Sequence, residues 1–156
     1  MTPVISFRKA NLSHLESIQY FLQEEVDKGI ILFRDKDEIA RNIQAYVLAY
    51  QEDTLVALGA LHIHSESLGE IRSLMVHQDF QGQGIGYLLI KELLSVATNI
   101  QLSKVLVLTY RASLFERLGF ELIQKEQIPD QKIWQDCIKC KFFPTKCQEI
   151  SLIKTI

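Results

Sequence analysis

The chain has 156 residues, 47% hydrophobic and 23% charged, which is the balance of a single globular domain over residues 1–156. Its formal charge of −2 argues against a nucleic-acid-binding protein, because such domains carry a clear excess of Lys and Arg. It has no apolar run of the roughly 18 residues that span a bilayer and no signal-peptide order at its N-terminus, so we expect a cytoplasmic protein.

The first predicted elements are a strand and a helix. Residues 5–8 alternate apolar and polar side chains, which indicates a strand with one buried face. Asn11 is a residue type that caps helices, and apolar residues recur after it at helical spacing. Gly29 is expected to end this helix. The apolar positions are Leu15, Ile18 and Leu22.

A second helix and an antiparallel meander are predicted next. Asp35 and Glu38 resemble a capping box, so a short helix is expected there. Ile39 and Ile43 would lie on its buried face. Polar turns then separate short strand-like runs, which favours antiparallel pairing. The predicted strands are 45–50, 55–63 and 70–76.

The pattern changes period after Gly86, where a helix is predicted. Residues 105–108 are a continuous apolar run, typical of a strand buried on both faces. The apolar face of the helix consists of Leu88, Leu89, Leu93 and Val96. The remaining predicted elements are a helix over 113–118 that ends at Gly119, and strands over 120–123 and 149–153.

The segment 76–86, between a strand and a helix, contains glycines at alternate positions. Gly82, Gly84 and Gly86 let the backbone turn tightly and approach a ligand closely. The N–H groups at the start of the next helix face outward, where the helix dipole favours an anion. The loop is therefore predicted to hold a diphosphate without a basic side chain.

The order of residues in this loop differs from that of two other phosphate-binding motifs. A Walker A loop ends in Gly-Lys-Ser/Thr, whereas Tyr87 follows Gly86 here. A dinucleotide fingerprint has the order G-x-G-x-x-G in a parallel unit, whereas these glycines run G-x-G-x-G after antiparallel strands. A glycine-rich turn without a ligand stays open on this segment alone.

The same loop resembles a family signature. Residues 81–86, Gln-Gly-Gln-Gly-Ile-Gly, are similar to the Q/R-x-x-G-x-G/A signature of GNAT acyltransferases. The element order resembles that fold from Ile5 to the C-terminus, and the Gly119-Phe120 pair matches its Gly-Phe signal after the fifth strand. The resemblance implies an α/β (α+β) fold. Its mixed, mostly antiparallel sheet would have six to seven strands, about four helices, and splayed fourth and fifth strands.

The resemblance also implies acetyl-CoA as co-substrate. Loop N–H groups would bind its pyrophosphate, and the fourth strand would pair with its pantetheine arm like an added strand. No metal is expected. The implied CoA-binding residues are Leu74, Met75 and Val76 on the strand, then Gln81, Gly82, Gln83, Gly84, Ile85, Gly86 and Tyr87.

Several segments resemble one branch of this family, the N-acetylglutamate synthases. Residues 29–34 are similar to its G-x-L-x-x-R segment, 70–77 to its fourth strand and 107–110 to its fifth. The tail over 132–147, with Trp, Cys and Pro in that order, resembles the ending of short, single-domain members. Longer members carry an amino-acid-kinase-like domain that typically hosts arginine inhibition. This chain has no room for it, so inhibition by that route is not expected.

A protonated amine must lose a proton before it attacks a thioester, and a carboxylate can accept that proton. The resemblance places this general base at Glu70, for which a strand-end carboxylate facing water is the alternative. Many GNAT enzymes have an acidic tyrosine at the position of Phe115, so that usual acid is absent. Thr109 matches the hydroxyl position of the synthases, and Tyr110 is the adjacent candidate on the opposite face of the strand.

Glutamate brings two carboxylates, which guanidinium groups can bind bidentately. Arg34 matches the carboxylate-binding position of the synthase branch. Arg72 is the second candidate, because it shares the strand face of Glu70. The alternative for either residue is a solvated surface arginine.

Cysteines and histidines have simpler interpretations. Cys137, Cys140 and Cys147 have partial zinc-ligand spacing, and three reduced thiols in a packed tail are the preferred reading. His62 and His64 are interpreted as structural residues. His77 is assigned to the start of the glycine loop.

These observations predict transfer of an acetyl group from acetyl-CoA to the α-amino group of L-glutamate, by direct attack in a ternary complex, in arginine biosynthesis. One alternative is a GNAT enzyme for another amine: an amino acid, a polyamine or a protein N-terminus. A second is a non-catalytic acyl-CoA-binding regulator. No nucleic-acid or membrane partner is expected, and homodimers are common in this fold.

Overall fold

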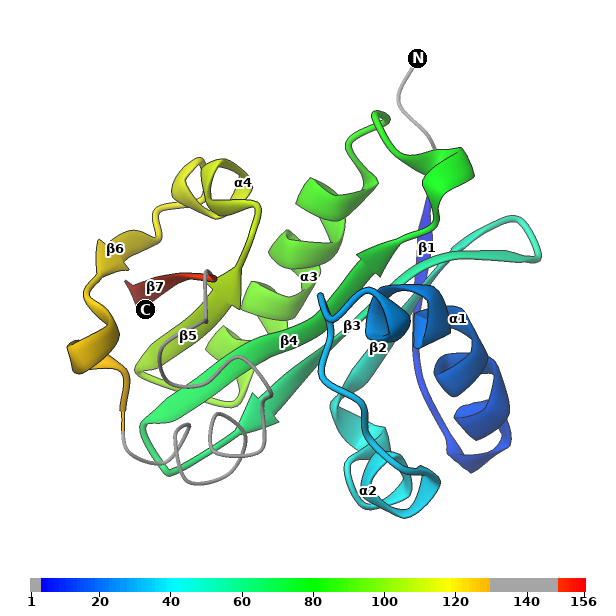
Figure 1. The fold of residues 1–156 in the computed structure, drawn as a ribbon, viewed down its shortest axis with the longest axis horizontal. Coiled ribbons are helices and arrows are strands. Elements are labelled where there is room, and N and C mark those ends of the chain that lie inside the picture. Colours follow the sequence, from blue (N-terminus) through cyan, green and yellow to red (C-terminus); the bar gives the residue numbers. More distant parts are fainter. Residues whose placement is uncertain (1–3, 130–148) are drawn as a thin grey trace. The chain divides into compact units, whose positions relative to one another are not determined.

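The structure is a computed structural model, and it describes residues 4–129 and 149–156. The strands of these residues form a seven-stranded mixed sheet in the order β1-β2-β3-β4-β5-β7-β6, accompanied by four α-helices (Figure 1). The mixed sheet, its strand count and its helices confirm the predicted fold class. The chain divides into two units, Met1–His62 with Ile71–Val96 and Ile63–Glu70 with Ala97–Ile156.

The first unit contains the N-terminal helices, the antiparallel strands and most of α3. β1 pairs antiparallel with β2, and β2 pairs antiparallel with β3, as the short links predict. The elements are β1 (Ser6–Lys9), α1 (Leu15–Asp27), α2 (Lys36–Arg41), β2 (Tyr46–Gln51), β3 (Thr54–Ile63), β4 (Leu68–Val76) and α3 (Ile85–Asn99). Short 3-10 turns lie at Leu12–His14, Ile43–Ala45 and Gln78–Phe80.

Helices α1 and α2 contact each other and cover one face of the strands in this unit (Figure 1). Alternate residues of β2 and β3 point into this face, because side chains along a strand alternate. Burial of these apolar side chains is the main force that holds the helices on the sheet. The core residues here include Ile18, Leu22, Ile39, Ile43, Tyr46, Leu48, Leu58, Ala60 and Met75.

Helix α3 packs against the opposite face, beside Gly59. A Cβ at Gly59 would lie 2.9 Å from Cδ1 of Leu74 and 3.2 Å from Cδ1 of Leu93. Leu93 belongs to α3 and is fully buried. The missing side chain at Gly59 therefore lets the helix approach the sheet closely.

The predicted helix ends are mostly confirmed. Asn11 caps the 3-10 turn that leads into α1, and Gly29 follows α1 with φ of +74°. Asp35 caps α2, because its side chain accepts from the Glu38 N–H at 2.8 Å. The second half of the predicted capping box is wrong, since the Glu38 carboxylate pairs with Arg34.

The second unit contains the C-terminal strands. β4 pairs in parallel with β5 at residues 68–70, and in the described chain this pairing covers only the first three residues of β4. The elements are β5 (Lys104–Thr109), α4 (Ala112–Glu116), β6 (Glu121–Ile123) and β7 (Ile150–Thr155), with a 3-10 turn at Lys125–Gln127.

The turn that ends helix α4 explains why Phe115 is a buried residue. Gly119 has φ of +93°, and the Phe120 N–H donates to the Phe115 carbonyl at 3.2 Å. This turn brings Phe115, inside the helix, close to Phe120, just after the helix end. The rings of Phe115 and Phe120 meet edge to face, with centroids 5.2 Å apart. Phe115 is thus a core residue at the position where many members of the resembled family have their tyrosine.

Candidate active site

The predicted phosphate-binding loop joins β4 to α3 in the first unit. Gly82 and Gly84 both have φ of +82°, a backbone conformation that favours glycine. A Cβ at either position would meet nothing within 4 Å, so the space beside this backbone is open. The first bond of the helix runs from the Leu88 N–H to the Gly84 carbonyl at 3.1 Å. The N–H groups just before Leu88 precede the intrahelical ladder, which suits an anion.

Side chains brace the start of this loop. The Gln81 side-chain amide donates to the Val76 carbonyl at 3.0 Å, and the Gln81 backbone N–H donates to the Gln78 carbonyl at 3.4 Å. The His77 N–H donates to the Val56 carbonyl at 2.9 Å, and its Nδ1 accepts from the Asp79 N–H at 3.2 Å. His77 therefore lies at the start of the loop, as predicted.

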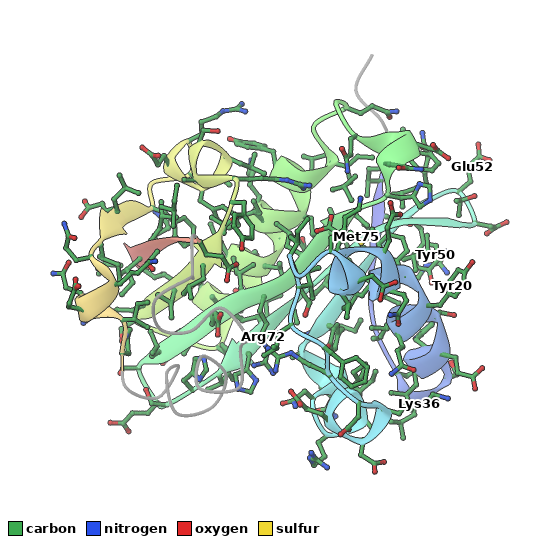
Figure 2. The ribbon with its side chains drawn as sticks, in the orientation of Figure 1. Tyr20, Lys36, Tyr50, Glu52, Arg72 and Met75 are labelled. Carbon is green, nitrogen blue, oxygen red and sulfur yellow. The ribbon has the colours of Figure 1, made fainter. Side chains whose placement is uncertain are left out.

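The predicted CoA-binding residues fall in three consecutive places. Leu74, Met75 and Val76 end β4, and Met75 belongs to the core under α1 and α2 (Figure 2). The next four predicted residues form the loop, and the last three lie in the first turn of α3. These last residues are Ile85, Gly86 and Tyr87.

Both arginines predicted to bind substrate are buried in the first unit, so neither is a solvated surface residue. The Arg34 side chain is 6% exposed, and its Nη1 lies 2.5 Å from Oε2 of Glu38, whose side chain is 26% exposed. Arg72, labelled on β4 in Figure 2, is the second buried guanidinium. Burial of two cations in one unit requires nearby acceptors or anions.

The two arginines act on the same phenol, Tyr46. Burial raises the pKa of Tyr46 above its ordinary value of 10. The positive charges of Arg34 and Arg72 oppose this rise, and so does a hydrogen bond with Ser73. Tyr46 therefore stays protonated and neutral at physiological pH, between two cationic groups.

Ser73 has φ of +58°, which is uncommon for a residue with a side chain. Arg72 and Ser73, although consecutive, both lower the pKa of Tyr46. Backbone strain of this kind is often found at functional sites.

A small pocket of about 10 Å³, open to solvent, lies beside these groups. Arg34, Tyr46 and Ser73 provide polar groups in its wall, and α1 provides Gln19 and Gln23 one turn apart. The remaining wall is apolar and consists of Leu22, Val26, Leu32, Phe33 and Ile39.

Glu70 lies in the second unit and is buried, so the reading of a carboxylate facing water is wrong. Its Oε1 is 2.8 Å from Nε2 of His64, and the two side chains are 3% and 0% exposed. Thr109, also in this unit, accepts a hydrogen bond on Oγ1 from the Arg111 N–H at 2.9 Å. Tyr110 is 46% exposed.

Sequence reasoning missed Tyr46, Ser73, Glu38 and the partner of Glu70. Tyr46 reads as an ordinary strand aromatic, and nothing in the sequence marks the positive φ of Ser73. For His64, the available signal was the short turn over 64–67, which brings it back beside the first residues of β4.

The metal and membrane predictions can be examined only in the described part of the chain. Cys137, Cys140 and Cys147 lie outside the described residues. Within residues 4–129 and 149–156, no group of three or more His, Cys, Asp or Glu side chains could hold a metal ion. In those same ranges no helix combines the length and apolar character needed to cross a membrane.

Comparison with known proteins gives consistent matches. The model of the acetyltransferase (GNAT) family matches residues 10–120. An uncharacterized N-acetyltransferase of Chlorobaculum tepidum is 33% identical over 151 residues, which cover 96% of this chain and 95% of that protein. An amino-acid acetyltransferase of Mycobacterium tuberculosis is 29% identical, over 97% of this chain and 87% of its own length.

Solved structures agree with these matches. A Mycobacterium tuberculosis protein crystallised in complex with CoA and NLQ has a TM-score of 0.80 at 27% identity, covering 99% of both chains. The N-acetylglutamate synthase of Neisseria gonorrhoeae has a TM-score of 0.82 over 99% of this chain and 36% of its own, with 19% identity, and this likeness concerns the fold alone. The present chain belongs to the acetyltransferase (GNAT) family of N-acetyltransferases, whose co-substrate is acetyl-CoA.

Proposed function

We propose that the protein acetylates the α-amino group of L-glutamate, as the N-acetylglutamate synthase of arginine biosynthesis. The observation that carries this proposal is the burial of Arg34 and Arg72 in the first unit, with Arg34 in the wall of a small pocket. An acceptor with two carboxylates matches two buried guanidinium groups in charge and in hydrogen-bonding geometry. A polyamine would be repelled by the same cations.

Acetyl-CoA would bind at the glycine loop. The open space beside Gly82 and Gly84, next to the N-terminus of α3, suits the pyrophosphate. The acceptor would bind with a carboxylate against Arg34, whose guanidinium lies in the wall of the small pocket. A guanidinium can bind Glu38 and a substrate carboxylate at the same time, because it carries several N–H donors on its planar fork.

The chemistry would be direct acyl transfer. Glu70 accepts a proton from the glutamate ammonium group, and the resulting amine attacks the thioester carbon. A C–N bond forms, the C–S bond breaks, and the electron pair leaves on the sulfur of CoA. Backbone N–H groups of β4 would stabilise the oxyanion that forms in between. Glu70 stands two residues before Arg72 on β4.

Thr109 would donate a hydrogen bond to the departing thiolate, while the nitrogen loses its second proton and the sulfur gains a proton through solvent. Its Oγ1 accepts from the Arg111 N–H, an arrangement that still allows the hydroxyl proton to be donated. Phe115 has no ionisable group, so it cannot take this role. The Mycobacterium tuberculosis relative named amino-acid acetyltransferase supports an amino-acid acceptor.

The proposal is tested by steady-state release of free CoA thiol from acetyl-CoA. L-glutamate is compared with L-glutamine, L-aspartate, other amino acids, spermidine and a short peptide. We expect L-glutamate to give the highest kcat/KM and mass spectrometry to identify N-acetylglutamate. A higher kcat/KM for a neutral amino acid or spermidine would show that this amine, and not L-glutamate, is the acceptor. CoA binding without turnover of any amine would instead support the regulator.

A further inference from the structure

The second unit holds a buried carboxylate–imidazole pair that the transfer chemistry does not yet explain. His64 Nε2 lies 2.8 Å from Glu70 Oε1, and both side chains are almost completely buried. We propose that His64 is a positioning residue for the general base, through an Nε2–H hydrogen bond that holds the Glu70 carboxylate. This inference rests on the proposed function, in which Glu70 takes the proton of the acceptor amine.

The backbone holds His64 in place through a short turn. The His64 N–H donates to the Leu68 carbonyl at 2.9 Å, which closes the turn onto the first residue of β4. Inside the turn, Ser65 Oγ accepts from the Leu68 N–H at 3.1 Å. The Ser67 carbonyl accepts from the Lys104 N–H at 3.0 Å, so the turn is also fixed to the start of β5. The imidazole is therefore presented to Glu70 by a braced segment.

The direction of the hydrogen bond follows from the chemistry of the base. A carboxylate that is to accept a proton must be ionised, and an ionised carboxylate only accepts hydrogen bonds. His64 must then be the donor, through Nε2–H. Such a bond favours the ionised form of a buried carboxyl group and fixes its orientation. Preorganisation of this kind raises the rate only if the base takes part in the transition state.

Two amide substitutions at His64 test this role. Glutamine has as many bonds between Cα and its Nε2 as histidine has, so His64→Gln can place an N–H donor near the position of the lost one. Asparagine is one bond shorter and cannot reach Glu70 Oε1 in the same geometry. Asparagine also leaves more empty space, so the Glu70→Gln background separates a positioning role from a packing role.

The experiment measures kcat and both KM values for His64→Gln, His64→Asn, Glu70→Gln and the double variant Glu70→Gln with His64→Asn. Isothermal titration with CoA, together with urea unfolding, verifies that each variant is folded. His64→Asn should lower kcat about tenfold or more, with the KM for acetyl-CoA unchanged. His64→Gln should recover most of the loss. In the Glu70→Gln background, His64→Asn should cost nothing further, because its effect passes through the carboxylate.

The outcomes distinguish the two proposals. Equal kcat values for His64→Asn and wild type, with Glu70→Gln inactive, would overturn the role of His64 and leave the proposed function intact. Equal losses for the Gln and Asn variants would also overturn it. Full activity of Glu70→Gln, or an inert wild type, would overturn the proposed chemistry itself and the inference built on it.

Discussion

Tyr46 of β2 and Ser73 of β4 share a side-chain hydrogen bond next to the pocket. Both residues are buried, and Ser73 has φ of +58°. This hydrogen bond links β2, in the antiparallel part of the sheet, to the β4 residue that follows Arg72. A phenol that stays neutral can donate one hydrogen bond without adding charge to a cationic site.

The titration of Tyr46 predicts a loss of stability at high pH. In the unfolded chain Tyr46 ionises at about pH 10, whereas in the folded chain its pKa is raised by burial. Above pH 10 the unfolded state therefore loses its proton first, and the free energy of unfolding falls as pH rises. Below pH 10 the contribution of Tyr46 is fully present. Urea unfolding of wild type and Tyr46→Phe at pH 8, 9, 10 and 10.5 measures the difference.

The other tyrosines are present in both proteins. Their ionisation therefore does not contribute to the difference in free energy of unfolding between wild type and Tyr46→Phe. We expect wild type to be more stable than Tyr46→Phe by about 1 kcal/mol at pH 8, from the lost hydrogen bond. This advantage should shrink between pH 10 and 10.5. A difference that stays constant over the whole range would show that Tyr46 titrates normally in the folded protein.

The glycine loop predicts a specific loss of coenzyme affinity. Gly84→Ala places a side chain at φ of +82°, which strains the backbone by about 1 kcal/mol and tilts the N–H groups at the start of α3. We expect the Kd for CoA, measured by titration calorimetry, to rise about tenfold, with a small change in the KM for glutamate. Gly29→Ala is the matched control, since Gly29 has φ of +74° at the end of α1.

Gly29→Ala should cost a similar amount of stability but leave the Kd for CoA unchanged. If both alanine variants bind CoA as the wild type does, the loop between β4 and α3 is not the pyrophosphate site. If both lose affinity equally, the effect comes from general destabilisation.

The cap of α2 predicts a local cost of stability. Asp35→Ala removes the acceptor of the Glu38 N–H and should lower the free energy of unfolding by about 1 kcal/mol. Asp37→Ala is the control, because it removes the same charge from the same first turn without removing the cap. Its cost should stay below about 0.5 kcal/mol. Equal costs in thermal unfolding would assign the effect to charge alone.

Features encoded by local sequence were predicted correctly. Asn11, Asp35, Gly29 and Gly119 are residue types whose own chemistry starts or ends a helix, so their positions follow from the sequence. The open backbone of the glycine loop was likewise predictable, because only glycine takes such φ values without strain. These features need no knowledge of distant contacts.

Features that depend on tertiary partners were not predictable. The capping box failed at Glu38 because Arg34 offers its carboxylate a stronger, charged partner than a backbone N–H. His64 gave no motif, since its partner depends on the register of a turn. The positive φ of Ser73 has no sequence signature, because serine ordinarily adopts negative φ. Sequence patterns carry no signal for such choices.

The most direct test of the account is the KM for L-glutamate of Arg34→Ala, with Arg41→Ala as control. Arg41 is an exposed arginine at the end of α2, close in sequence and equal in charge. Loss of the buried guanidinium should raise the KM for glutamate at least about tenfold, because it removes a charge-assisted hydrogen bond. The KM for acetyl-CoA should stay within about twofold, and Arg41→Ala should change neither. Equal, small changes in both KM values of Arg34→Ala would contradict the claim that this pocket binds the carboxylate of the acceptor.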